Sequence, residues 1–148
     1  MPLKNTWQNG ETFSASDANA VATAINTFGT SPILTTPLVN GYTEGVTAIG
    51  TVTTDTMLSI TSATILTATL TASTPCTFTM PTATAGKSFT LFLKQAATTG
   101  NGTATFTGVK WGSAGTPTVT ATIRTMDIFS FFSDGTSWYG TVVQGYTY

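Results

Sequence analysis

The acidic side chains are the first residues in this sequence that could do chemistry, because the chain contains no histidine. A histidine-based catalytic triad, a histidine general base and a histidine metal site are therefore excluded. Asp55 and Asp127 could in principle supply the two carboxylates of a glycosidase, but no other residue supports that pair. Asp17 and Asp134 have structural explanations, as a helix-start residue and a hairpin-turn residue. We expect no enzymatic activity.

Cys76 and Lys87 are the next candidates. Cys76 is the only cysteine, which excludes an internal disulfide and a thiolate metal site. It alternates with threonines, and this pattern predicts a small buried residue, with an intermolecular disulfide as the alternative. The segment Gly86-Lys87-Ser88 is similar to the end of a phosphate-binding loop, but the first glycine of that motif is missing and a strand follows, which predicts a turn. We therefore expect neither a cofactor nor a bound metal.

The aromatic side chains could bind a ligand instead of doing catalysis. Trp111, Tyr139, Tyr146 and Tyr148, together with Trp138, could form a platform on which a sugar stacks. Alternatively, Trp138 packs in the core and the terminal tyrosines pack against a neighbouring subunit. Aromatic residues supply large contact areas in cores and interfaces, so we favour packing and keep the glycan platform as the alternative.

Composition indicates a β-rich protein that meets partners over much of its surface. Charged residues make up 7% of the 148 residues, whereas soluble domains carry about a quarter. Threonine, which is β-branched and favours strands, accounts for about a quarter of the chain. The formal net charge of -1 contributes little to solubility. A chain of this kind is better suited to an assembly than to free diffusion.

The same composition argues against two classes of partner. The basic residues are scattered as Lys4, Lys87, Lys94, Lys110 and Arg124, whereas nucleic-acid binding needs clustered basic side chains. No unbroken apolar stretch approaches the roughly 20 residues of a membrane helix. The N-terminus does not resemble a signal peptide, so we expect synthesis in a cytoplasm without standard secretion.

The periodicity of apolar residues divides the chain into three parts. Residues 15–27 have helical spacing, with Ser14 as the N-cap and Gly29 as the stop. Residues 1–30 are therefore expected to be a segment with a short helix, which must dock on something because an isolated helix of this length is marginal. Residues 31–56 are expected to be an extended connector.

Residues 57–148 are expected to form a β-domain, because the apolar period changes to two. Gly100-Asn101-Gly102 and Asp134-Gly135 predict hairpin turns. Many short strands separated by turns, without an internal repeat, predict an antiparallel β-sandwich or jelly roll. The strands are expected at residues 64–70, 76–80, 89–93, 103–109, 119–123, 126–132 and 138–143, with a further extended segment at 46–52.

Two groups of segments resemble structural proteins of tailed bacteriophages. Residues 7–21, from Trp7 to Val21, look like the opening of many virion proteins, in which this segment attaches the subunit to the particle. A second group is similar to a β-domain of phage fibre and capsid-surface proteins. It comprises residues 41–44, 76–89, 106–111 and 126–140.

The resemblance implies a function in the virion. Proteins of this family typically form trimers, so the chain is expected to bind copies of itself. The resemblance further implies a capsid decoration (cement) protein, which binds the major capsid protein on the outer surface of the particle. A short tail or head fibre, or a minor tail protein bound to tail or vertex proteins, is the alternative, and a host-glycan adhesin is a third. The expected attachment residues are Trp7, Phe13, Val21, Ile25 and Phe28.

Overall fold

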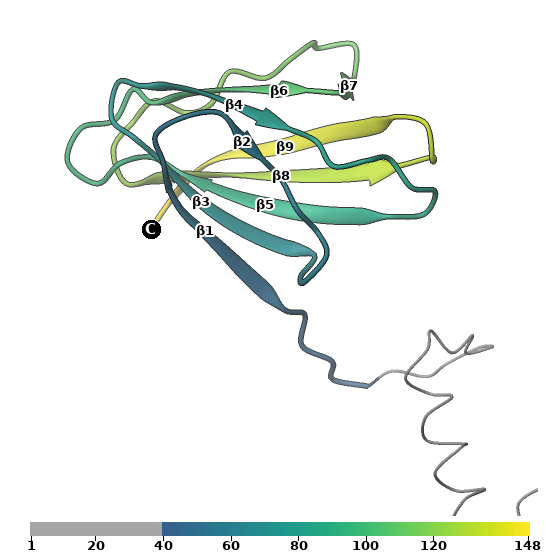
Figure 1. The fold of residues 1–148 in the computed structure, drawn as a ribbon. Helices are drawn as coiled ribbons and strands as arrows, with labels where there is room; N and C mark the ends of the chain where they lie inside the picture. Colours follow the sequence, from purple (N-terminus) through teal and green to yellow (C-terminus); the bar gives the residue numbers. More distant parts are fainter. Residues whose placement is uncertain (1–39) are drawn as a thin grey trace, which may run out of the picture. The chain divides into compact units, whose positions relative to one another are not determined.

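The computed structural model describes residues 40–148, and this part of the chain contains strands and no helix. The mainly β class predicted from the sequence is confirmed, while the predicted helix at residues 15–27 lies outside the described residues. The strands are β1 (Val46–Val52), β2 (Thr56–Met57), β3 (Ile65–Leu70), β4 (Pro75–Thr79), β5 (Ser88–Lys94), β6 (Thr103–Thr107), β7 (Val109–Trp111), β8 (Thr125–Ser133) and β9 (Trp138–Thr147) (Figure 1).

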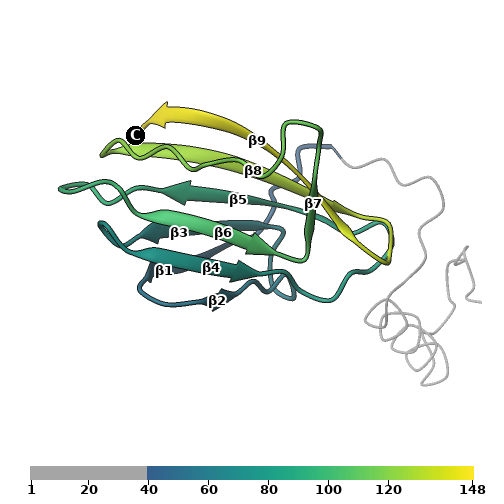
Figure 2. The same ribbon diagram turned by 90° about the horizontal axis from the view of Figure 1, so that it is seen from above.

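The first six strands alternate between two sheets that face each other (Figures 1 and 2). The large sheet has the order β1-β3-β5-β8-β9-β7, and the small sheet has the order β2-β4-β6. The chain therefore winds from one sheet to the other and back, adding one strand to each sheet per turn. This arrangement is like a β-solenoid, and the β8–β9 hairpin extends its large sheet.

The predicted antiparallel β-sandwich or jelly roll is wrong, because the sheets are mixed. Strands β1, β3 and β5 pair in parallel, as do β2, β4 and β6. Among the described strands, antiparallel pairing is confined to β5 with β8 and β8 with β9. The prediction failed because side chains alternate with a period of two in both kinds of sheet, so the alternation does not reveal the partner or its direction.

Aromatic side chains from both sheets fill the core between them. Phe78 and Phe106 stack at 5.4 Å from the small sheet, and Phe106 reaches Phe129 of the large sheet at 4.7 Å. Trp138 is 2% exposed, lies edge-on to Phe89, and donates an indole hydrogen bond to the Pro81 carbonyl at 2.8 Å. The expected packing of Trp138 in the core is confirmed.

One of the two predicted hairpins is present. The segment at Asp134-Gly135 joins the antiparallel strands β8 and β9. The Asp134 carboxylate accepts hydrogen bonds from the backbone amides of Thr136 and Ser137, both at 2.8 Å, and from the Tyr139 hydroxyl at 2.9 Å. These three bonds hold the pKa of Asp134 at about 2, below its usual 3.8.

The other predicted hairpin and one predicted strand are absent. Gly100-Asn101-Gly102 carries the chain from β5 to β6, which lie in different sheets. The buried Gln95 fixes this crossing, because its side-chain amide donates to the Gly102 carbonyl at 2.7 Å and accepts from the Gly102 amide at 3.1 Å. Residues 119–123 form no strand, although Val119 is buried in the core.

The compact β-unit runs from Thr43 to Tyr148. It includes β1, at the same residues 46–52 that the sequence predicts to be extended. Residues 43–56 of the expected connector 31–56 therefore belong to this unit, and β1 forms the edge of its large sheet beside β3.

Candidate functional site

The outer face of the large sheet, which points away from the core, is the most unusual surface of the described residues. In each strand the buried side chains alternate with those of this outer face. An outer face of a sheet normally carries polar side chains. Here several large apolar side chains are exposed on it: Val46 (60%), Phe132 (55%), Tyr139 (41%), Val143 (57%) and Tyr146 (44%).

The middle of this face forms a continuous apolar area, which runs across three neighbouring strands. Ile128 lies opposite Val143, and Met126 lies opposite Tyr146. Phe92 on β5 is the partner of Ile128 on its other side, and it is half-buried. We call these five residues the apolar area.

The charged side chains that the strands present on the outer face are cations that lie over aromatic rings, and the Glu44 carboxylate lies at one end of the face. On their outer side these strands carry two charged side chains, Lys94 and Lys110, whereas Asp127 of β8 is buried. The Lys94 ammonium lies 4.9 Å from the centroid of the Tyr148 ring, and that of Lys110 lies 5.7 Å from the Tyr139 ring. Such cation–π contacts partly satisfy the charge. The face therefore offers a partner an apolar surface with few charges to desolvate.

The four aromatic residues proposed as a sugar platform do not lie together. Trp111 packs edge-on against the core ring of Phe106, at 5.8 Å. Tyr139 and Tyr146 lie on the outer side of β9, and their separation of seven residues corresponds to about 20 Å along a strand. Tyr148 follows β9 and donates a hydrogen bond to the Gln95 carbonyl. These four residues therefore do not form a single platform.

The five expected attachment residues, Trp7, Phe13, Val21, Ile25 and Phe28, lie outside the described residues.

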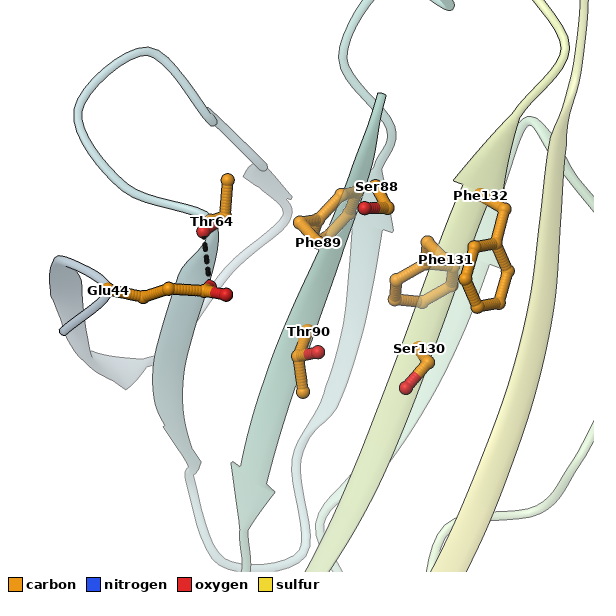
Figure 3. A pocket seen from close by; sticks show the side chains of 8 residues that line it. All are labelled: Glu44, Thr64, Ser88, Phe89, Thr90, Ser130, Phe131 and Phe132. Carbon is orange, nitrogen blue, oxygen red and sulfur yellow. Dashed lines mark hydrogen bonds between the residues drawn. The ribbon is translucent and has the colours of Figure 1, made fainter. Parts of the chain in front are cut away.

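A pocket of about 190 Å³ lies at one end of the outer face, and we call it the end pocket (Figure 3). Four segments of the chain line it: the residue positions before β1 and before β3, the start of β5, and the second half of β8. The lining residues are Glu44, Thr64, Ser88, Phe89, Thr90, Ser130, Phe131 and Phe132. Sequence reasoning missed this pocket, because its hydroxyl groups belong to strands that are far apart in the sequence.

Strand register explains why the hydroxyl groups of the end pocket gather. Thr90 lies directly opposite Ser130, and Ser88 lies opposite Phe132. All four side chains belong to the outer face, because Phe89 and Phe131 between them point into the core. Glu44 approaches from the side and accepts a hydrogen bond from the Thr64 hydroxyl at 2.6 Å. The pocket thus combines a carboxylate, several hydroxyls and one exposed aromatic ring.

The two acids considered as a glycosidase pair each have a structural role. Asp127 is 2% exposed and accepts hydrogen bonds from Thr120, Gln144 and Gly145. Asp55 is exposed and accepts a hydrogen bond from the Thr77 amide at 3.0 Å. These contacts organise a loop and a strand.

Cys76 and Lys87 also have structural roles. Cys76 is 3% exposed, and its thiol lies 3.0 Å from the Thr54 carbonyl, which confirms the predicted small buried residue. Burial raises the pKa of this thiol. The amide of Lys87 donates to the Thr84 carbonyl at 3.1 Å and β5 follows at once, which confirms the predicted turn.

Residues 40–148 contain neither a metal-binding cluster nor a membrane-spanning helix. They contain no group of three or more histidine, cysteine, aspartate or glutamate side chains placed to hold a metal ion. They also contain no helix with the length and hydropathy needed to span a membrane.

Comparison with known proteins found no matching family model, no matching curated protein and no matching solved structure.

Proposed function

We propose that this chain is a structural component of a tailed-phage virion, and that its copies associate through the apolar area of the large sheet. The observation that carries the proposal is the exposure of Val143 and Tyr146 on a sheet face with few charges. Exposed apolar surface of this kind marks a site of protein association. The scarcity of charge in the whole sequence, at 7%, supports the same conclusion.

Association through the face is favoured over association through the sheet edge. The exposed edge strand β1 contains a bulge between Ala48 and Gly50, where Gly50 has a φ of +87°. A bulge interrupts the row of backbone groups that another strand would need for pairing. The face of the sheet is therefore a better surface for a second copy than the β1 edge is.

Within the virion we propose a trimeric capsid decoration protein. The trimer and the place on the capsid come from the resemblance to phage proteins of residues 7–21 and of the group 41–44, 76–89, 106–111 and 126–140. Such a trimer would link neighbouring capsid subunits and stabilise the capsid by mass action. Particles that lack the protein are expected to lose resistance to heat, and unchanged resistance would contradict the cement role.

A sedimentation experiment tests the self-association directly. The full chain is expected to sediment as a trimer, and Val143→Asp is expected to shift it toward the monomer because a charge is placed in the apolar area. Met57→Asp is the matched control, because Met57 is 75% exposed but lies on the small sheet. A wild-type monomer at all concentrations, or equal effects of the two substitutions, would contradict the proposed interface.

The alternative is a short fibre or minor tail protein with an adhesin function. The end pocket is the observation that favours it, because an adhesin needs a place where a ligand can bind. Copy number separates the two, since decoration proteins occur in hundreds of copies and fibres in a handful.

A further inference from the structure

The end pocket contains hydrogen-bonding groups that the described part of the protein does not use. Within residues 40–148, the side-chain hydroxyls of Ser88, Thr90 and Ser130 make no hydrogen bond to another protein group. A hydroxyl both donates one hydrogen bond and accepts others. These three groups therefore suit a ligand that also carries several hydroxyls, each of which donates and accepts.

An aromatic ring stands beside these hydroxyls. Phe132 is 55% exposed and lies directly opposite Ser88, across the β5–β8 pair. Figure 3 shows its ring beside Phe131 on the β8 side of the pocket, across from Glu44. An exposed phenyl ring offers a flat apolar surface, and the face of a pyranose ring that carries its C–H groups can pack on such a surface.

Charge narrows the class of ligand. The pocket lining contains the carboxylate of Glu44 and no basic side chain. The carboxylate of an acidic sugar would meet no basic side chain in this lining to offset the loss of its hydration. The volume of about 190 Å³ is below that of pockets for drug-sized ligands, so it suits a single ring.

We propose that the end pocket binds one uncharged pyranose residue, such as the exposed terminal sugar of a glycan. Ser88, Thr90 and Ser130 hydrogen-bond the sugar hydroxyls, and Phe132 packs on the face of the ring. The affinity of one open pocket is weak, with a Kd on the order of millimolar. This binding goes beyond the proposed structural function, although a trimer would present three pockets and raise the avidity.

Nuclear magnetic resonance titration of the full ¹⁵N-labelled chain tests the proposal. The probes are glucose, galactose, mannose and N-acetylglucosamine up to about 50 mM, with N-acetylneuraminic acid as the acidic sugar. At least one neutral sugar is expected to cause saturable shifts in the amide signals of Ser88, Thr90 and Ser130. No saturable shift with any neutral sugar, or shifts with the acidic sugar alone, would overturn the proposal.

Two variants give the titration a control. Phe132→Ala is expected to weaken the binding at least tenfold, whereas Met57→Ala, which removes an exposed side chain of the small sheet, leaves it unchanged. Equal binding by Phe132→Ala and wild type would overturn the proposed contact. Because Phe132 is exposed, its replacement is expected to leave the fold intact. The amide spectrum of the variant checks this directly.

Sedimentation of the same samples separates this proposal from the proposed function. A trimer that binds no neutral sugar rejects the pyranose site alone. A monomer that binds a neutral sugar rejects the proposed assembly alone.

Discussion

Replacing the buried Asp127 by asparagine tests how the loop before β8 is held against the sheet. One carboxylate oxygen of Asp127 accepts from the Thr120 hydroxyl at 2.7 Å and from the Gly145 amide at 2.9 Å. The other accepts from the Thr120 amide at 2.7 Å and from the Gln144 side chain at 3.2 Å. Each oxygen therefore faces a backbone N–H.

The arrangement of these donors sets the size of the effect. In Asp127→Asn one oxygen becomes an NH2 group, and in either orientation of the amide this group faces a backbone N–H that cannot rotate away. A hydrogen bond to a charged group contributes about 1.5–3 kcal/mol, and a buried donor without an acceptor costs about 1–3 kcal/mol. We expect the free energy of unfolding to fall by about 3 kcal/mol, which corresponds to a drop of roughly 10–20 °C in Tm for a domain of this size.

Urea unfolding followed by tryptophan fluorescence measures this change, because Trp138 is buried in the core. Asp55→Asn is the matched control. Asp55 is exposed, and only one of its oxygens accepts a hydrogen bond, from the Thr77 amide. The new amide can turn its oxygen toward that donor, so a loss below about 1 kcal/mol is expected. If Asp127→Asn unfolds within about 1 kcal/mol of wild type, the reasoning about buried donors is refuted.

Three further predictions concern Gly140 beside Trp111 of β7, the Asp134 turn and the Cys76 thiol. Gly140→Ala is expected to cost about 1–3 kcal/mol in urea unfolding, because its Cβ would lie 2.5 Å from the Trp111 ring, whereas Gly112→Ala, with no atom within 4 Å, is expected to be tolerated. Since the pKa of Asp134 is lowered from 3.8 to about 2, its contribution to stability is present above pH 3.8 and is lost as the pH falls toward 2; the stability gap between wild type and Asp134→Ala should therefore close over that range, and a constant gap would contradict the turn geometry. Cys76 is expected to react with a thiol reagent only on unfolding, because it is buried and its pKa is raised; rapid labelling of the folded protein would show that the thiol is accessible.

The positions of most strands could be predicted from the sequence, because burial on one face leaves a local record in every second residue. This alternation predicts the strands around Phe78 and Leu91, whereas residues 126–132 are apolar on both faces and residues 46–52 are an extended segment of the turn-rich connector. The Asp134-Gly135 hairpin was also predictable, since the turn and both strands it joins are adjacent in the chain.

Pairing between strands could not be predicted, because it depends on contacts between distant segments. Gly100 and Gly102 were interpreted as hairpin residues, whereas they are needed where the chain crosses between sheets. A Cβ on Gly100 would lie 2.1 Å from the Ala121 carbonyl oxygen, and one on Gly102 would lie 2.7 Å from Leu70 Cβ. This crowding leaves the same glycine signal in the sequence as a tight turn does.

The candidate sites depended on pairing even more strongly. Phe132 and Tyr146 could be recognised as aromatic residues near strands, but their exposure on one apolar face follows from the order of the strands in the large sheet. The end pocket needs Thr90 opposite Ser130, and this register joins residues that are 40 positions apart. Neither the apolar area nor the end pocket could therefore be predicted without the strand order and register of the large sheet.

Copy number in purified particles tests the central claim most directly. Under the proposed function the chain belongs to a phage virion, so quantitative mass spectrometry of purified particles would compare its amount with that of the major capsid protein. A structural decoration protein is expected at hundreds of copies per particle, in a multiple of three. Its absence from purified particles would contradict a function in the virion, and a handful of copies would contradict the decoration role in favour of a fibre.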